Sequence, residues 1–112
     1  MRHLIVCLIF SLAGTPFAHA DNLAVDNLGD ALAYMVACPG RLWYDLDVMH
    51  AYAEQNKLEW QEGTAGFAKV EARARKTTQL LLTRPKDEVC VEGYRYYGKF
   101  GTKAPRFLTW WQ

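Results

Sequence analysis

The segment YDLDVMH holds the side chains that are best placed to do chemistry together in this chain. Asp45, Asp47 and His50 can ligate a cation or act as acid and base. On a helix, however, residues two apart point to different faces, so the two carboxylates are not expected to converge. We expect Asp45 near a helix start, where an acid suits the helix dipole, and His50 as a solvated or hydrogen-bonded residue. The segment therefore predicts no catalytic residue and no metal site.

Composition excludes several catalytic classes. Ser11 is the one serine, and of the three histidines only His50 follows residue 20. Beyond residue 20 the chain thus lacks a serine nucleophile, and one histidine is too few for a zinc hydrolase. No glycine-rich phosphate loop occurs, and no cofactor is expected. Carboxylate chemistry survives because twelve acids are available, so a carboxylate-dependent hydrolase of envelope polymer stays open as an alternative function.

The first twenty residues are typical of a secretory signal peptide. A positively charged start precedes an apolar run over residues 4–13, and the small-x-small sequence AHA ends at Ala20. The apolar run is too short to span a bilayer, which takes ~20 residues. We expect cleavage after Ala20, a single helical domain over residues 21–112, no transmembrane segment in the mature chain, and a periplasmic or secreted location.

Two cysteines, Cys38 and Cys90, follow the expected cleavage point. In an oxidising compartment, two such thiols are most simply interpreted as a disulfide. A redox pair or a metal site would call for a C-x-x-C motif or for more ligands than the chain offers. A bridge across this long loop would stabilise the fold by ~4 kcal/mol at most. It would also leave no thiol for Cys–His catalysis.

Apolar residues that recur every three or four positions predict helices. Such stripes run over residues 22–38, 42–56 and 59–84. The third helix is expected to become regular only near Ala65, because two glycines weaken its start.

Asp87 is expected to cap a fourth helix, which loses regularity at Gly98 and Gly101. Residues 102–112 are expected to form an extended tail. The mature chain has no long alternating run, so no sheet is predicted. The fold class is therefore all-α: a small bundle of three or four helices tied by one disulfide, with an extended aromatic C-terminal tail.

Aromatic residues are efficient core material in a domain of this size. The rings expected to fill the core are those of Tyr94, Tyr97, Phe100, Phe107 and Trp110. Adjacent residues of an extended segment face opposite ways, so Trp110 and Trp111 are not expected to be buried by the same surface.

The closing segment is basic and aromatic, and no acid follows Glu92. Trp, Tyr and Arg are enriched where proteins bind one another. We therefore predict that Arg95, Lys103, Arg106 and Trp111 contact a partner, expected to be another protein. Peripheral contact with an anionic envelope surface is the other option for such residues. Nucleic acid is not expected, because an exported protein rarely meets it.

Charge is divided unevenly between the two halves of the mature chain. Residues 21–62 hold two basic and eight acidic residues, whereas residues 63–112 hold ten basic and four acidic ones. Either the halves neutralise each other within the fold, or an acidic and a basic face pair with a partner or with a second copy.

The motifs VACPG, CVEG and YYGKFG resemble those of small, uncharacterised, one-disulfide exported helical proteins of Gram-negative bacteria. The chain is also similar in outline to acid-stress periplasmic chaperones and to periplasmic immunity proteins that block cell-wall hydrolases. The resemblance itself implies no activity. We expect an exported, non-enzymatic binding protein of the inhibitor or immunity type, with an acid-activated chaperone as an alternative.

Overall fold

The computed structural model describes residues 23–111, so the predicted signal peptide lies outside the described residues. The described chain begins with a helix over residues 23–37, here called the central helix. The elements that follow it are β1 (Leu42–Tyr44), α2 (Leu46–Gln55), α3 (Ala65–Leu81), α4 (Lys86–Tyr97) and β2 (Leu108–Trp110). Within this part of the chain, no helix combines the length and the apolar character needed to cross a membrane.

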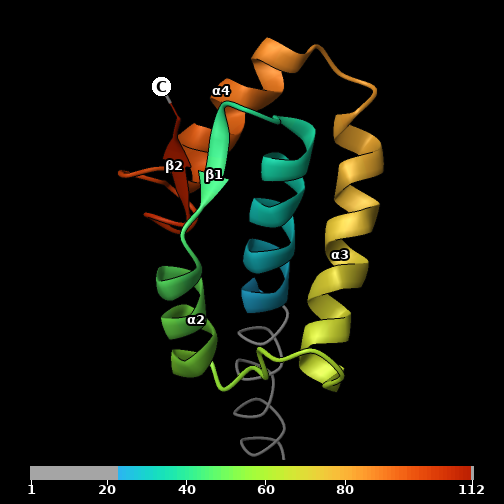
Figure 1. Cartoon of the computed structure of the whole chain (residues 1–112), viewed down its shortest axis with the longest axis vertical. Coiled ribbons are helices and arrows are strands. Elements are labelled where there is room, and N and C mark those ends of the chain that lie inside the picture. The colour runs from blue at the N-terminus through green and yellow to red at the C-terminus, as the bar shows by residue number, and fades with distance from the viewer. Residues whose placement is uncertain (1–22, 112) are drawn as a thin grey trace, which may run out of the picture.

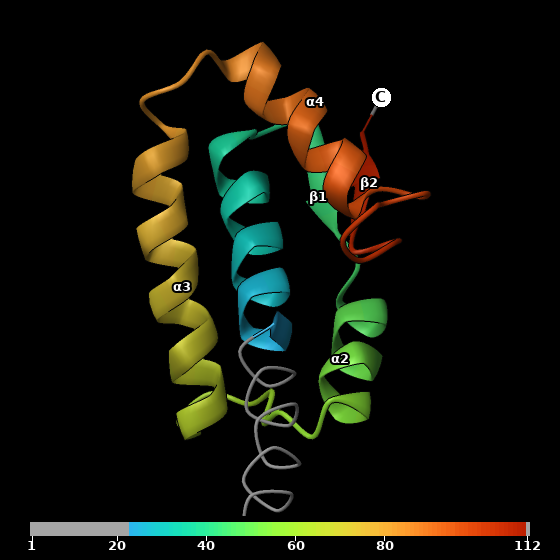
Figure 2. The same ribbon diagram turned by 180° about the vertical axis from the view of Figure 1, so that it is seen from behind.

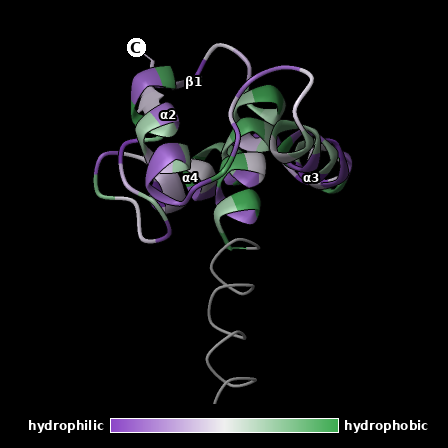
Figure 3. Ribbon diagram, turned by 90° about the horizontal axis from the view of Figure 1, so that it is seen from below, coloured by the Kyte–Doolittle hydropathy of each residue, from purple (hydrophilic) through white to green (hydrophobic). Residues whose placement is uncertain are grey.

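The central helix lies between α3 on one side and α2 and α4 on the other (Figures 2 and 3). Glycines allow its closest contacts. A Cβ on Gly29 would lie 2.5 Å from Cγ of Arg73 in α3. A Cβ on Gly93 in α4 would lie 2.8 Å from the Tyr34 ring. Both helix contacts therefore depend on glycine, which has no side chain to hold the helices apart.

The core forms where the central helix, α2, α4 and β2 meet. Tyr97 and Phe107 are fully buried there and stack with ring centroids 6.0 Å apart. Asn27, in the same region, donates to the Tyr52 hydroxyl at 3.0 Å and accepts from the Tyr97 hydroxyl at 3.4 Å. This buried amide therefore ties the central helix to both α2 and α4.

Two of the five rings predicted for the core, Tyr97 and Phe107, are confirmed there. Tyr94 and Trp110 are half-buried against each other, with centroids 5.4 Å apart. The prediction was wrong for Phe100, which is 84% exposed. Helix α4 ends at Tyr97 with Gly98 as its C-cap, and Phe100 lies in the turn that follows.

The predicted disulfide between Cys38 and Cys90 is confirmed. The two Cα atoms are 5.5 Å apart, and both residues are fully buried. The bridge joins the end of the central helix to the first half of α4.

The prediction that the chain contains no sheet was wrong. Strands β1 and β2 form an antiparallel pair in which Trp43 lies opposite Thr109. Each strand has only three residues, too few for an alternating pattern to stand out in the sequence. The predicted extended tail is likewise only partly correct, because residues 102–107 form turns and only β2 is extended.

Two predicted helix starts were also wrong. Helix α2 begins at Leu46 rather than near residue 42, whereas the expectation that Asp45 lies near a helix start is confirmed, because Asp45 accepts from the Val48 amide at 3.1 Å. Asp87 does not cap α4; the cap position is Pro85, and Asp87 lies in the first turn. The predicted start of α3 at Ala65 is confirmed, with Thr64 as its cap.

Candidate functional site

The four predicted partner-binding residues lie at three places on one side of the fold formed by α4, β2 and the segment between them. Arg95 and Lys103 flank Tyr96, with Cζ and Nζ at 5.4 Å and 4.2 Å from its ring centroid. Arg106 lines a groove beside β2. Trp111 lies just past β2 and contacts Trp43. The structure thus brings two of the four together and gives each of the others a different neighbourhood.

The outer face of the sheet carries an exposed aromatic pair, Trp43 and Trp111. Leu42 and Leu108 point inward and are buried, whereas Trp43 is 51% and Trp111 56% exposed. The two indole rings meet edge to face, with centroids 5.7 Å apart. The Trp111 amide donates to the Arg41 carbonyl at 2.7 Å, which extends the strand ladder and fixes the position of Trp111. An ordered aromatic pair that stays half in solvent is a candidate contact surface.

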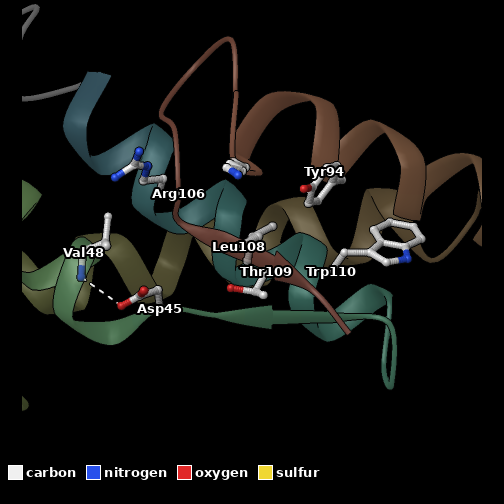
Figure 4. A pocket seen from close by; sticks show the side chains of 8 residues that line it. Asp45, Val48, Tyr94, Arg106, Leu108, Thr109 and Trp110 are labelled. Carbon is white, nitrogen blue, oxygen red and sulfur yellow. Dashed lines mark hydrogen bonds between the residues drawn. The ribbon is translucent and has the colours of Figure 1, made fainter. Parts of the chain in front are cut away.

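A groove of about 470 Å³ runs along β2 (Figure 4). Its apolar wall consists of Tyr94, Leu108 and Trp110, and its charged residues are Lys99, Arg106 and Asp45. The Asp45 carboxylate already accepts the Val48 amide as a helix cap. Neither cation forms an ion pair with a carboxylate of the described residues. The groove therefore favours an acidic ligand.

The edge of β2 that faces away from β1 carries backbone groups without a partner strand. The Asp45 amide donates to the Phe107 carbonyl and the Trp111 amide to the Arg41 carbonyl. Hydrogen-bonded pairs alternate along an antiparallel ladder, so the N–H and C=O groups of Leu108 and Trp110 point away from β1. No backbone hydrogen bond of these four groups occurs within the described residues. An extended segment of a partner can pair with such an edge.

Sequence reasoning missed Trp43 and Lys99. Trp43 was assigned to a helix, and its exposure on a sheet face follows only from the pairing with β2. Lys99 lies in the acid-free closing segment, and this charge pattern was the signal that could have identified it.

Asp45, Asp47 and His50 do not form a joint site. Asp45 caps α2 near its predicted place, and Asp47 is exposed. Nε2 of His50 lies 3.9 Å from a carboxylate oxygen of Glu54, one turn along the helix. Among the described residues, no three acidic, histidine or cysteine side chains are grouped closely enough to hold a metal ion.

Glu92 is the centre of a charge network beside α4. It accepts two hydrogen bonds from Arg84, at 2.8 Å and 3.0 Å, and a third from the Tyr34 hydroxyl. The bonds from Arg84 are the main reason that the pKa of Glu92 falls to about 2. Burial, reinforced by the bond to Glu92, raises the pKa of Tyr34. Because the pKa of Glu92 lies far below 7, its carboxylate is ionised at neutral pH. Through it, the network joins the central helix to α4.

Asp30 is the corresponding centre between the central helix and α3. Arg73 binds it with two nitrogens, at 2.8 Å and 3.0 Å, and the Thr77 hydroxyl donates to it at 2.6 Å. Arg73 also lies 3.3 Å from Asp26. These contacts pair acids of the first half with a base of the second. Part of the charge asymmetry is therefore neutralised inside the fold.

Comparison with known proteins does not place the chain in a family. No family model, no curated protein and no solved structure matches it. Its function is therefore inferred from its own residues and their geometry.

Proposed function

We propose that the chain is an exported, non-enzymatic binding protein of the cell envelope that acts by protein–protein interaction, as an inhibitor or immunity protein. The observation that carries this proposal is the exposed pair Trp43 and Trp111, held in place by the strand ladder. Tryptophan is among the residues that contribute most to protein–protein affinity. Rings that are already ordered lose little freedom on binding, which favours tight association.

The groove beside β2 supports a partner with an extended, acidic segment. Its free strand edge offers backbone hydrogen bonds, and Lys99 and Arg106 offer positive charge. Addition of a strand to a sheet edge is a common way for proteins to bind one another. Complementary charge would then speed the encounter and select the partner.

The test is capture of a partner from envelope extract at neutral pH. The wild-type protein is expected to retain one stable partner, whereas Trp43→Ala and Trp111→Ala should each weaken that complex by about 30-fold. Leu82→Ala is the matched control, because Leu82 is also a large apolar residue, 66% exposed, but lies after α3. The proposal fails if no partner is reproducibly retained, or if the control weakens capture as much as the tryptophan variants do.

The ion pairs between helices favour an acid-activated chaperone as the second candidate. Asp30–Arg73 joins the central helix to α3, and Glu92–Arg84 fastens the segment before α4 to that helix. The ionised form of Glu92 stabilises the fold, and this contribution is lost as the pH falls from about 4.5 towards 2. Acid would thereby loosen the helices and expose their apolar faces.

A further inference from the structure

The segment between α4 and β2, residues 98–107, is here called the basic loop. It projects sideways from the body of the molecule in opposite views (Figures 1 and 2). Phe100 lies in this loop and is 84% exposed, the largest exposed fraction of any large apolar side chain in residues 23–111. A phenylalanine left in water forgoes the free energy that burial would supply, so its position calls for an explanation.

The basic loop is held in one conformation by backbone hydrogen bonds. The amides of Thr102 and Lys103 donate to the carbonyls of Arg95 and Tyr96 at 3.1 Å and 3.0 Å. The Arg106 amide donates to the Gly98 carbonyl at 2.7 Å, and Arg106 takes a left-handed φ of 69°, which is uncommon for a residue other than glycine. The loop thus keeps Phe100 in solvent by its own geometry.

Four cations lie in the basic loop or in the last turn of α4, directly before it. They are Arg95, Lys99, Lys103 and Arg106. Nζ of Lys99 lies 5.5 Å from the Phe100 ring centroid. None of the four pairs with a carboxylate of residues 23–111, and the chain has no acid after Glu92. The loop therefore presents an apolar tip together with cations that form no ion pair within residues 23–111.

We infer that the basic loop binds an anionic lipid surface, with Phe100 inserted at the boundary between headgroups and acyl chains. An aromatic residue at that depth and cations against lipid phosphates are the two contributions that hold proteins at membrane surfaces. A lipid surface accepts a convex tip of this shape, whereas a protein partner would need a matching pocket for it. This inference goes beyond the proposed function and uses residues distinct from the Trp43–Trp111 pair.

Sedimentation with lipid vesicles tests the inference directly. The protein is purified with the N-terminus that it carries in its native host. It is then mixed with vesicles of phosphatidylcholine alone or of phosphatidylcholine with phosphatidylglycerol. We expect binding only to the anionic vesicles, and weaker binding as the ionic strength rises. Phe100→Ala should lower the affinity at least about tenfold. Phe100→Trp should retain it, because tryptophan suits the membrane interface.

Charge variants provide the matched comparison. Removal of one cation at the end of α4 and one in the basic loop, in Arg95→Gln/Lys103→Gln, should weaken binding about 25-fold, since each cation near an anionic surface contributes about fivefold. Arg75→Gln/Lys76→Gln removes the same charge from exposed positions of α3 and should have a much smaller effect. Every variant keeps the same N-terminus, so any contribution of the N-terminus to vesicle binding is the same in all of them.

Three results would overturn the inference: equal binding to both kinds of vesicle, anionic binding that survives Phe100→Ala, or an equal loss in the two charge variants. The partner-capture assay distinguishes failure of the lipid inference from failure of the proposed function. Phe100→Ala should capture the protein partner as well as the wild type does. If Phe100→Ala fails to capture the protein partner and the wild type does not bind vesicles, the basic loop contacts a protein instead. That result would overturn the lipid inference.

Discussion

At the scale of single residues, the side chains with perturbed acid–base behaviour lie in contacts between elements. The pKa of Glu92 is lowered because Arg84 and Tyr34 donate hydrogen bonds to it. Asp30 is paired with Arg73 in the same manner, and the bond to Asp30 raises the pKa of Arg73. The exposed residues proposed to bind partners are, by contrast, cations and aromatic rings. Stability and binding therefore depend on different sets of side chains.

Glu92→Gln is expected to destabilise the protein and to change its response to acid. The folded-state pKa of Glu92, about 2, is below its ordinary value of 4.5. Its ionised form therefore stabilises the fold fully above about pH 4.5, and this contribution is lost as the pH falls towards 2. Glu92→Gln should cost about 1–3 kcal/mol at pH 7 and flatten the loss of stability across that window.

Urea unfolding at a series of pH values measures this effect. Glu71→Gln is the matched control, because Glu71 is exposed on α3 and makes no ion pair within the described residues. A Glu92→Gln curve that parallels the wild-type curve between pH 4.5 and pH 2 would rule out this role for the carboxylate.

At the scale of elements, the separation between helices is set by glycine. The central helix approaches α3 at Gly29 and α4 at Gly93, and in both places a methyl group would overlap a neighbouring side chain. The disulfide fixes a third contact, between the end of the central helix and α4. The contact at Gly93 and the disulfide hold α4, and hence β2 and the basic loop, in a fixed position against the central helix.

Gly29→Ala is expected to lower the free energy of unfolding by about 1–3 kcal/mol. Helix propensity alone would favour alanine by ~1 kcal/mol. The added methyl, however, would lie 2.6 Å from Cβ of Arg73 and 3.0 Å from the Val70 carbonyl oxygen. Because neither atom is the end of a flexible side chain, α3 must move away. Chemical denaturation measures the change, and a gain in stability would show that the two helices are not closely packed there.

At the scale of the whole molecule, opposite charges from the two halves of the chain meet across the fold. Asp26 and Asp30 pair with Arg73, and Asp87 pairs with Arg41 at 2.5 Å. The cations of the closing segment form no ion pair within the described residues. The molecule thus combines an internally neutralised body with one basic, aromatic side.

Acid should loosen this body if the chaperone alternative is correct. As the pH falls from about 4.5 towards 2, Glu92 loses its charge while Arg84 keeps its own, so the network that joins α4 to the central helix is weakened. We then expect fluorescence of an apolar dye to rise between pH 4 and pH 2, with helical circular dichroism largely retained. The disulfide would still join the central helix to α4. Absence of dye binding down to pH 2 would remove the chaperone alternative.

Local chemistry was enough to predict the helices and the bridge. The start of α3 at Ala65 follows from the two glycines around it, and the end of α4 at Gly98 from glycine's poor fit to a helix. The Cys38–Cys90 bridge, which the structure confirms, was predicted from the number of cysteines and an expected oxidising compartment. The acid-free closing segment also pointed to the side of the molecule where the groove and the basic loop lie.

Only the tertiary structure determined which residues of this closing segment are buried and which are exposed. The pairing of β1 with β2 joins residues that are far apart in the sequence, and three-residue strands carry no local signal of it. That pairing places Trp43 beside Trp111 and leaves an edge of β2 free. The turn after Gly98 sends Phe100 outward, while Phe107, in the same loop, returns to the core. The sequence by itself determined which residues were available for binding; contacts between distant segments determined which of them reached the surface, because burial depends on neighbours that sequence spacing does not reveal.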